Sequence, residues 1–232
     1  MQQNRKNMNE LKKIFYGNTG RYIHRWDHYF DIYDQYFSKY RDKNIVVLEV
    51  GVWEGGSLVM WSNYFGDLAQ IYGVDNDPEC ANKVQSPNIK VFIGSQSDRE
   101  FLRKLKQEIP KIDILIDDGG HHMDQQIITF EELFDHINDG GVYLCEDLHT
   151  SYWEYFGGGY KKFNSFIEYT KNLIEHLNAY IVRRPEMPVT ELTKNINAIH
   201  YYDSIVVIEK KARSEPSSVI TGKKHTQPYV KR

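Results

Sequence analysis

The sequence feature that most constrains the fold is a series of five short apolar runs, rich in Val and Ile, with glycine or an acidic residue near each end. Between the runs, Leu, Ile and Phe recur at spacings of three and four residues, the period of an amphipathic α-helix. Apolar strands that alternate with helices are typical of parallel strands buried on both faces. The sequence therefore predicts an α/β protein with a Rossmann-like, doubly wound, mostly parallel sheet. The predicted strands are residues 44–52, 70–75, 88–94, 111–118 and 140–147, and the predicted helices are residues 56–65, 98–109 and 126–137.

Further segments flank this unit on both sides. Residues 25–40 carry an aromatic stripe at helical spacing, which predicts a helix packed over the sheet. Residues 165–177 predict another amphipathic helix, and residues 197–210 predict two strands joined near Asp203, the second closing the sheet in an antiparallel direction. We therefore divide the chain into an N-terminal helical extension (1–43), one catalytic α/β domain (44–210) and a flexible tail (211–232).

Composition excludes several classes of protein. The chain has 232 residues, 29 basic and 32 acidic side chains and a formal net charge of −3, so we expect no nucleic-acid partner. Cys80 and Cys145 lie far apart without a CxxC spacing, which argues against a disulfide scaffold and favours a reducing compartment, the cytoplasm. No apolar stretch approaches the ~18 residues of a membrane span, and the N-terminus lacks the apolar core of a signal peptide. The sequence leaves open whether the chain forms a homo-oligomer.

A glycine-rich turn follows the first predicted strand, where Glu49, Gly51, Gly55 and Ser57 lie within LEVGVWEGGSL. In an open α/β sheet, ligands bind beyond the carboxyl ends of the strands. Glycines let the backbone pass close to a ligand, and the helix that starts after them presents free N–H groups. The GxxxG spacing differs from the GxGxxG of dinucleotide binders, so a nicotinamide cofactor is disfavoured.

Polar residues also follow the second and third predicted strands. Asp75 ends the second strand, next to Asn76, where a carboxylate could accept two hydrogen bonds from a ribose diol. Ser95, Gln96 and Ser97 follow the third strand and offer donors and acceptors for an adenine edge. Helix caps at both places are the alternative interpretation. Together with the glycine turn, these residues resemble the S-adenosylmethionine site of class I methyltransferases.

Two acidic pairs close the next two predicted strands. Asp117 and Asp118 end the fourth strand, and Glu146 and Asp147 end the fifth. The 28 residues from Asp118 to Glu146 make one strand-helix-strand unit, so both pairs should emerge at the same edge of the sheet. Carboxylates gathered there repel each other unless they are protonated or neutralised by a cation. All-oxygen ligation favours Mg²⁺ or Mn²⁺ over zinc, and helix capping without a metal is the alternative.

Five motifs, taken in order, resemble the metal-dependent sugar O-methyltransferases related to mycinamicin and macrocin methyltransferases. The motifs are LEVGVWEGGSLVMW, YGVDNDP, IDDGGHHMDQQ, GGVYLCEDLHTSYW and HYYDSIVVIEK, within roughly residues 20–210. The wider group is often named cephalosporin hydroxylase-like, and rhamnosyl O-methyltransferases and a chlorovirus glycan-methylating domain are similar. Relatives carry GTDK before a His-Tyr pair, whereas this chain has GNTGRYIHRWDHY and keeps His28 and Tyr29.

The resemblance implies S-adenosyl-L-methionine as the methyl donor and Mg²⁺ or Mn²⁺ as the metal. It implies that Asp118, Glu146 and Asp147 hold the metal and that His121 is the general base. The expected contacts of the donor are Glu49, Gly51, Gly55, Ser57, Asp75, Asn76, Ser95, Gln96, Ser97 and Asp117.

The expected acceptor is a sugar or glycan, with rhamnose or another deoxyhexose as the favoured class. A sugar hydroxyl is a weak acid, so a divalent ion that lowers its pKa and an imidazole that accepts its proton suit the reaction. We expect His149, Tyr152 and Trp153 to contact the acceptor, since aromatic faces stack on the C–H surface of sugars, although packing roles are the alternative. His122 is the other candidate base, and a structural role is favoured for it. Residues 183–197 form a predicted loop near the acceptor.

Three rival functions stay open on the sequence alone. The first keeps the fold and metal but methylates a catechol-like or other non-sugar hydroxyl. The second is an iron-dependent hydroxylase, which requires two histidines and one carboxylate around an open metal position. The third is a non-catalytic nucleotide-binding domain, which leaves the complete acidic cluster without a purpose.

Overall fold

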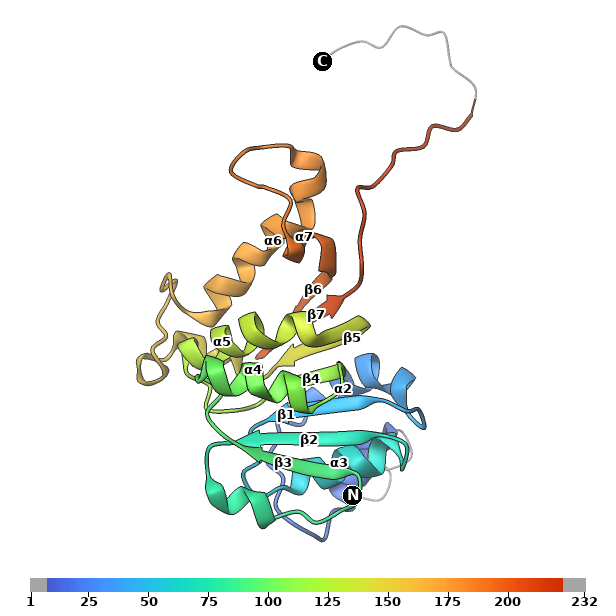
Figure 1. Cartoon of the computed structure of the whole chain (residues 1–232), viewed down its shortest axis with the longest axis vertical. Coiled ribbons are helices and arrows are strands. Elements are labelled where there is room, and N and C mark those ends of the chain that lie inside the picture. The colour runs from blue at the N-terminus through green and yellow to red at the C-terminus, as the bar shows by residue number, and fades with distance from the viewer. Residues whose placement is uncertain (1–7, 223–232) are drawn as a thin grey trace, which may run out of the picture.

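In the computed structural model, which describes residues 8–222, seven strands form one sheet in the order β3-β2-β1-β4-β5-β7-β6 (Figure 1). Five strands, β1 to β5, pair in parallel, and β7 runs antiparallel between β5 and β6. The prediction of a doubly wound α/β sheet with an antiparallel closing strand is therefore confirmed. The strands are β1 Val46–Val50, β2 Gln70–Asp75, β3 Ile89–Ile93, β4 Ile112–Asp117, β5 Ile137–Cys145, β6 Ile196–Tyr202 and β7 Ile205–Lys210.

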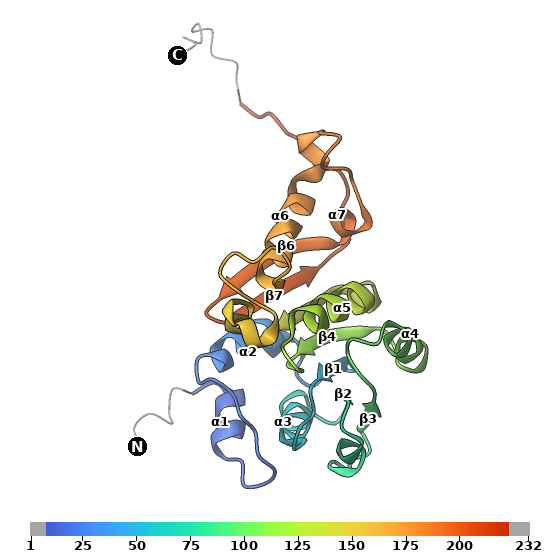
Figure 2. The same cartoon turned by 90° about the vertical axis from the view of Figure 1, so that its left-hand side faces the viewer.

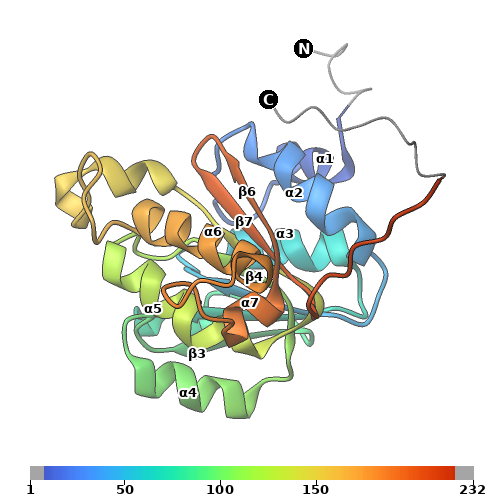
Figure 3. The same ribbon diagram turned by 90° about the horizontal axis from the view of Figure 1, so that it is seen from above.

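Helices cover both faces of the sheet, and alternate residues of each central strand point to opposite layers. Val47, Ile114 and Val207 pack with α1, α2 and α3, whereas Leu48, Leu115 and Val206 pack with α4, α5 and α6. Figure 2 shows α1 and α3 on one side of the strands and α4 on the other, and the view from above in Figure 3 agrees. The helices are α1 Glu10–Tyr16, α2 Tyr29–Phe37, α3 Gly56–Phe65, α4 Arg99–Glu108, α5 Met123–Leu133, α6 Phe166–Val182 and α7 Glu191–Asn195. Five 3₁₀ turns accompany them within the described residues: η2 Ser38–Tyr40, η3 Pro78–Asn82, η4 Phe134–His136, η5 Leu148–Tyr152 and η6 Glu154–Phe156.

The aromatic stripe of the N-terminal extension forms a shorter helix than its spacing predicted. α2 begins at Tyr29 rather than at residue 25, and residues 17–28 contain no helix or strand. Tyr33 and Phe37 pack edge-on against Trp61 of α3, with ring centroids 5.3 and 5.8 Å apart. The extension therefore shares one apolar core with α3 and one face of the sheet.

The structure adds detail to two segments that the sequence predicts to lack regular structure, the loop 183–197 and the tail from residue 211. The predicted loop 183–197 contains the short helix α7, whose N-cap Thr190 accepts a hydrogen bond from the backbone N–H of Thr193. Residues 211–222 of the predicted tail contain no helix or strand, and residues 223–232 lie outside the described residues, as do residues 1–7 of the extension. Between residues 8 and 222, no helix combines the length and the apolar character needed to span a membrane.

Candidate active site

A cavity of about 380 Å³ opens at the carboxyl ends of the parallel strands. The loops that follow β1, β2, β3, β4 and β5 all contribute to its wall, and residues 22–26 of the N-terminal segment complete it. This is the edge at which an open α/β sheet binds ligands, and the volume suits a small-molecule ligand. The cavity therefore lies at the edge of the sheet where the sequence predicts a ligand site.

The glycine turn after β1 brings the backbone close to the loop that follows β4. Gly51 has φ +96°, and a Cβ atom on it would lie 2.0 Å from the carbonyl oxygen of Asp118. Gly55 has φ +77° and caps the N-terminus of α3, while Ser57 in the first turn lines the cavity with Gly51. A side chain at Gly51 would force these loops apart, and one at Gly55 would collide with the Val84 side chain.

Asp75 holds this turn in place from the end of β2. Its Oδ2 accepts hydrogen bonds from the backbone N–H groups of Val52 (2.8 Å) and Trp53 (3.0 Å), and its Oδ1 accepts one from Asp77 (3.0 Å). Burial opposes ionisation, but these donors together keep the pKa of Asp75 below its usual value. An ionised carboxylate beside Asn76 therefore lines the cavity where the ribose contact was predicted.

Gln96 connects the loops after β3 and β4. Its Nε2 donates to Asp117 Oδ1 (3.1 Å), and its Oε1 accepts from the backbone N–H of Gly120 (2.8 Å). Gln96 and Ser95 line the cavity, whereas Ser97 hydrogen-bonds to Ser95 and does not reach it. Both polar ends of the Gln96 amide thus serve the turn before His121, a role that the sequence did not reveal.

Three of the expected cofactor contacts lie behind the cavity wall. Gly55 is outside the lining, and Asp117 and Glu49 are buried beneath it. Burial raises the pKa of Asp117 to about 7, against hydrogen bonds from Tyr143 and Gln96. Glu49 Oε2 accepts from Ser57 Oγ (2.6 Å). These residues support the wall, and direct contact with a cofactor stays a prediction for each.

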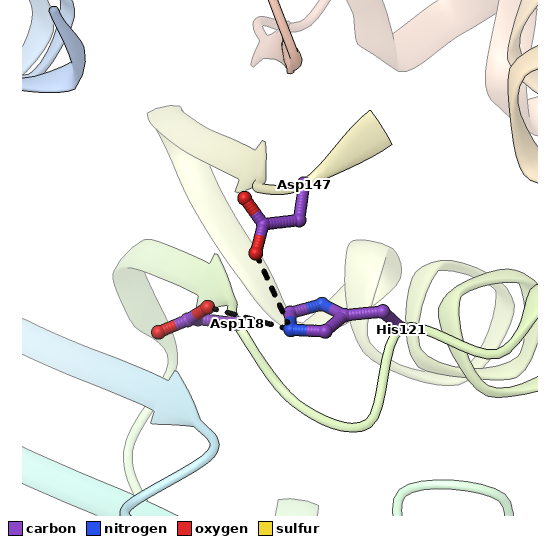
Figure 4. Close-up of side chains that lie close together, drawn as sticks. All are labelled: Asp118, His121 and Asp147. Atoms are coloured by element: carbon purple, nitrogen blue, oxygen red, sulfur yellow. Dashed lines mark ion pairs between the residues drawn. The ribbon is translucent and has the colours of Figure 1, made fainter. Parts of the chain in front are cut away.

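The acidic cluster forms around His121 (Figure 4). The His121 Nε2 lies 3.9 Å from Asp118 Oδ1 and 3.5 Å from Asp147 Oδ2, and one potential ligand atom of each residue lies within 4.8 Å of the other two. His121 (φ 57°) and Asp147 (φ 53°) both adopt the left-handed conformation, which is uncommon outside glycine and clusters at functional sites. Three loop residues thus converge on one point of the cavity wall.

Glu146, the third predicted metal ligand, lies beside this cluster and faces the N-terminal segment. Its Oε1 accepts a hydrogen bond from the Tyr33 hydroxyl (2.6 Å), and its Oε2 lies 3.3 Å from Arg25 Nε. Burial raises the pKa of Glu146 to about 7, while the Arg25 charge acts in the opposite direction. The structure therefore groups Asp118 and Asp147 with His121 and places Glu146 in a second position on the same wall.

Arg25 is the cation of the cluster. Its guanidinium contacts Glu49 Oε1 at 2.7 Å, Asp118 Oδ2 at 2.6 Å and Glu146 Oε2 at 3.3 Å. Burial raises the pKa of Asp118 well above its usual range, and Arg25 opposes this effect. Arg25 is one positive charge among four carboxyl groups, those of Glu49, Asp118, Glu146 and Asp147. A divalent cation would neutralise the remaining negative charge when these groups are ionised.

The chemistry of these donors fits Mg²⁺ or Mn²⁺. Within residues 8–222, no hydrogen-bond donor reaches Asp118 Oδ1 or Asp147 Oδ2, and both oxygens face the same point near His121. The buried His121 Nδ1 likewise has no partner among the described residues. Carboxylate oxygens with an adjacent imidazole suit a hard divalent ion.

His122 does not join the cluster. It is the N-cap residue of α5, and its ring packs against Phe156 with centroids 5.4 Å apart. The structural role predicted for His122 matches this packing. Among residues 8–222, two histidines and one carboxylate therefore do not converge, which disfavours the iron-dependent hydroxylase.

Two of the residues predicted to contact the acceptor, His149 and Trp153, form a rim with Trp26 beside Asp147, and of these three only Trp26 lines the cavity. The His149 Nδ1 hydrogen-bonds to Ser204 Oγ and lies 4.0 Å from Asp147 Oδ1. Trp153 and Trp26 pack edge-on against the His149 ring, with centroids 4.8 and 6.2 Å away, and both tryptophans are about half exposed. Tyr152 is also exposed. The sequence places Trp26 in the aromatic stripe, and its place beside His149 is visible only in the structure.

The comparisons with known proteins agree with this geometry. A family model described as a methyltransferase domain matches residues 48–148. The chain is 34% identical over 191 residues to the 8-demethyl-8-alpha-L-rhamnosyl tetracenomycin-C 2'-O-methyltransferase of Streptomyces olivaceus, covering 78% of this chain and 50% of the relative. It is 33% identical over 194 residues to the mycinamicin VI 2''-O-methyltransferase of Micromonospora griseorubida, covering 79% and 48%. The chain thus spans about half the length of the curated relatives it matches.

Solved structures show the same similarity. The MycE methyltransferase from the mycinamycin biosynthetic pathway, in complex with Mg, SAH and mycinamycin VI, matches with a TM-score of 0.75 and 31% identity, over 88% of this chain and 53% of that one. A putative caffeoyl-CoA O-methyltransferase from Staphylococcus aureus, 11% identical over 91% of this chain and 96% of its own with a TM-score of 0.52, shares the fold alone. The chain therefore carries a methyltransferase domain of the class I fold and is similar to sugar O-methyltransferases.

Proposed function

We propose that this protein transfers a methyl group from S-adenosyl-L-methionine to a sugar hydroxyl with the help of Mg²⁺ or Mn²⁺. The observation that carries the proposal is the convergence of Asp118, His121 and Asp147 on the wall of the cavity that Gly51 and Asp75 also line. A donor site and a proton-accepting site therefore share one cavity. The similarity to O-methyltransferases of rhamnosyl tetracenomycin-C and mycinamicin VI supports a deoxyhexose such as rhamnose as the acceptor.

His121 is the proposed general base. Burial lowers its pKa below the usual value, against the raising effect of Asp147, and thereby favours the neutral ring that a base requires. The Nε2 atom faces the open oxygens of Asp118 and Asp147, where a hydroxyl held beside them would lie within reach. A divalent ion held by Asp118 and Asp147 would lower the pKa of that hydroxyl. The cavity walls would align the acceptor oxygen with the methyl carbon and the sulfur of the donor.

The donor occupies the part of the cavity formed by the first three strand ends. Asp75 would accept from the ribose hydroxyls, Asn76 lies beside it, and Ser95 and Gln96 would face the adenine. Gly51 and Ser57 line the cavity next to α3, where the remainder of the donor would lie. These assignments rest on the carboxyl-edge rule and on the lining of the cavity.

The acceptor would enter over the rim of Trp26, His149 and Trp153. The two exposed indole rings offer apolar faces to the C–H surface of a pyranose, and His149 offers a ring nitrogen to a hydroxyl. We further propose the cytoplasm as the working compartment, which the free, buried thiols of Cys80 and Cys145 support. The expectation of no nucleic-acid partner stays a prediction.

An acceptor panel tests the proposal. The protein is incubated with S-adenosyl-L-methionine carrying a labelled methyl group, Mg²⁺, and either rhamnosides, other deoxyhexosides or a catechol. We expect label on a ring hydroxyl of the deoxyhexosides and none on the catechol. Transfer to the catechol alone would replace the sugar acceptor with a non-sugar one, and transfer to neither, with no binding of the donor by calorimetry, would refute the activity.

A further inference from the structure

One short N-terminal segment touches all three carboxylates that the proposed metal site would use. Arg25 Nη1 contacts Asp118 Oδ2 at 2.6 Å, and the hydroxyl of Tyr29 donates to Asp147 Oδ1 at 2.7 Å. The hydroxyl of Tyr33 donates to Glu146 Oε1 at 2.6 Å. Each acid thus receives a separate partner from residues 25–33.

The contacts divide the oxygens of the cluster into two sets. The oxygens of Asp118 and Asp147 that face the segment are engaged by Arg25 and Tyr29, whereas Asp118 Oδ1 and Asp147 Oδ2 point toward His121. A carboxylate held through one oxygen cannot rotate freely, so its other oxygen is kept in one direction. Outer partners of this kind orient metal ligands in proteins and affect metal affinity.

The helix that carries the two tyrosines is well placed to act as a rigid support. Tyr29 and Tyr33 are one helical turn apart and therefore lie on the same face of α2. Both side chains are buried, and the Tyr33 ring packs edge-on against Trp61 and parallel to Phe37. The hydroxyls are thus fixed by aromatic packing that does not involve the acids.

We propose that Arg25, Tyr29 and Tyr33 are positioning residues that preset Asp118, Asp147 and Glu146 for a divalent cation. This inference rests on the metal dependence of the proposed function. Residues 25–33 would then orient the metal ligands as well as connect the N-terminus to the sheet. Without the two phenols, the acids lose their fixed orientation, so the cation binds more weakly.

The two tyrosines give the cleaner test because replacing them changes no charge. Tyr29→Phe and Tyr33→Phe each remove one hydroxyl and keep the packed ring. Tyr36→Phe is the matched control, since Tyr36 lies on the same helix but its hydroxyl pairs with the Tyr202 hydroxyl at 2.7 Å and reaches no acid. Removing Arg25 would also change the charge next to the cation, which acts on affinity in the opposite direction.

The measurement is a titration of each protein with Mn²⁺, followed by electron paramagnetic resonance of the free ion, together with calorimetric titration with S-adenosylhomocysteine. We expect Tyr29→Phe and Tyr33→Phe to raise the Kd for Mn²⁺ by about tenfold or more. Tyr36→Phe should leave that Kd unchanged, and all three variants should keep the affinity for S-adenosylhomocysteine. Methyl transfer by the two affected variants should recover toward the unaltered kcat as Mn²⁺ is raised.

Each other outcome counts against the inference. Unchanged Mn²⁺ affinity in both Tyr29→Phe and Tyr33→Phe, or an equal loss in Tyr36→Phe, would overturn the positioning role while leaving the metal site in place. A parallel loss of S-adenosylhomocysteine affinity would show a general structural effect and would also overturn it. If the unaltered protein binds no Mn²⁺, the metal dependence of the proposed function fails and the inference fails with it.

Discussion

Asp117 offers a prediction whose size follows from the structure. The side chain is buried below the cavity, and its two oxygens accept from Gln96 Nε2 and the Tyr143 hydroxyl, each at 3.1 Å. Burial raises the pKa of Asp117 from 3.8 to about 7 despite these bonds. Replacing Asp117 with Asn keeps the shape of the side chain and removes its titration. We expect Asp117→Asn to be more stable than the unaltered protein at neutral pH.

The sign and magnitude of the effect depend on where each state releases its proton. The unfolded chain loses the Asp117 proton near pH 3.8, whereas the folded chain keeps it to about pH 7. Between these values the unfolded state binds fewer protons, so this residue lowers stability as pH rises, and above about pH 7 the loss is constant. At about 1.4 kcal/mol for each pH unit, the full effect is on the order of 4 kcal/mol.

Urea unfolding of both proteins in metal-free buffer from pH 4 to pH 8 measures this difference. The free energy of unfolding of Asp117→Asn minus that of the unaltered protein should grow across this range and level off above about pH 7. A difference that does not change with pH, or a variant that is less stable at pH 8, would refute the reasoning.

Three further predictions concern the site itself. His121→Ala should lower kcat by about 10²–10⁴ and leave donor affinity unchanged, whereas His122→Ala should keep most activity; equal losses in stopped-flow transfer assays would remove His121 as the base. Asp75→Ala should weaken S-adenosyl-L-methionine binding in calorimetry, and unchanged affinity would move the ribose contact elsewhere. Trp153→Ala should raise the KM for a deoxyhexoside more than it lowers kcat, and an unchanged KM would exclude the indole from the acceptor rim.

The positions of the parallel strands and the edge that carries the site could be predicted because apolar runs and the polar residues that end them are local patterns. Runs buried on both faces mark parallel strands, and each predicted parallel strand overlaps an observed one. The two acidic pairs then had to emerge together, since β4 and β5 are adjacent and parallel. α7 was missed because five residues carry too little periodicity to distinguish a helix from a loop.

The composition of the cluster could not be predicted to the same depth. Glu146 and Asp147 are consecutive, and the sequence did not show that Glu146 faces Arg25 while Asp147, in a left-handed conformation, faces His121. Arg25 reaches the acids from a segment without helix or strand, for which the sequence has no periodic signal. Tyr29 and Tyr33 belong to the predicted aromatic stripe, and their rings pack in the core as the spacing indicated. The spacing did not indicate that their hydroxyls contact Asp147 and Glu146.

Chelation and rescue of methyl transfer test the central claim most directly. The protein is assayed with labelled S-adenosyl-L-methionine and a rhamnoside in EDTA, and then after addition of excess Mg²⁺ or Mn²⁺. The arrangement of Asp118, His121 and Asp147 predicts that transfer is lost in EDTA and returns with either ion in the unaltered protein, but does not return in Asp118→Asn. Full transfer in EDTA, or full rescue of Asp118→Asn, would contradict a carboxylate metal site as the basis of the reaction.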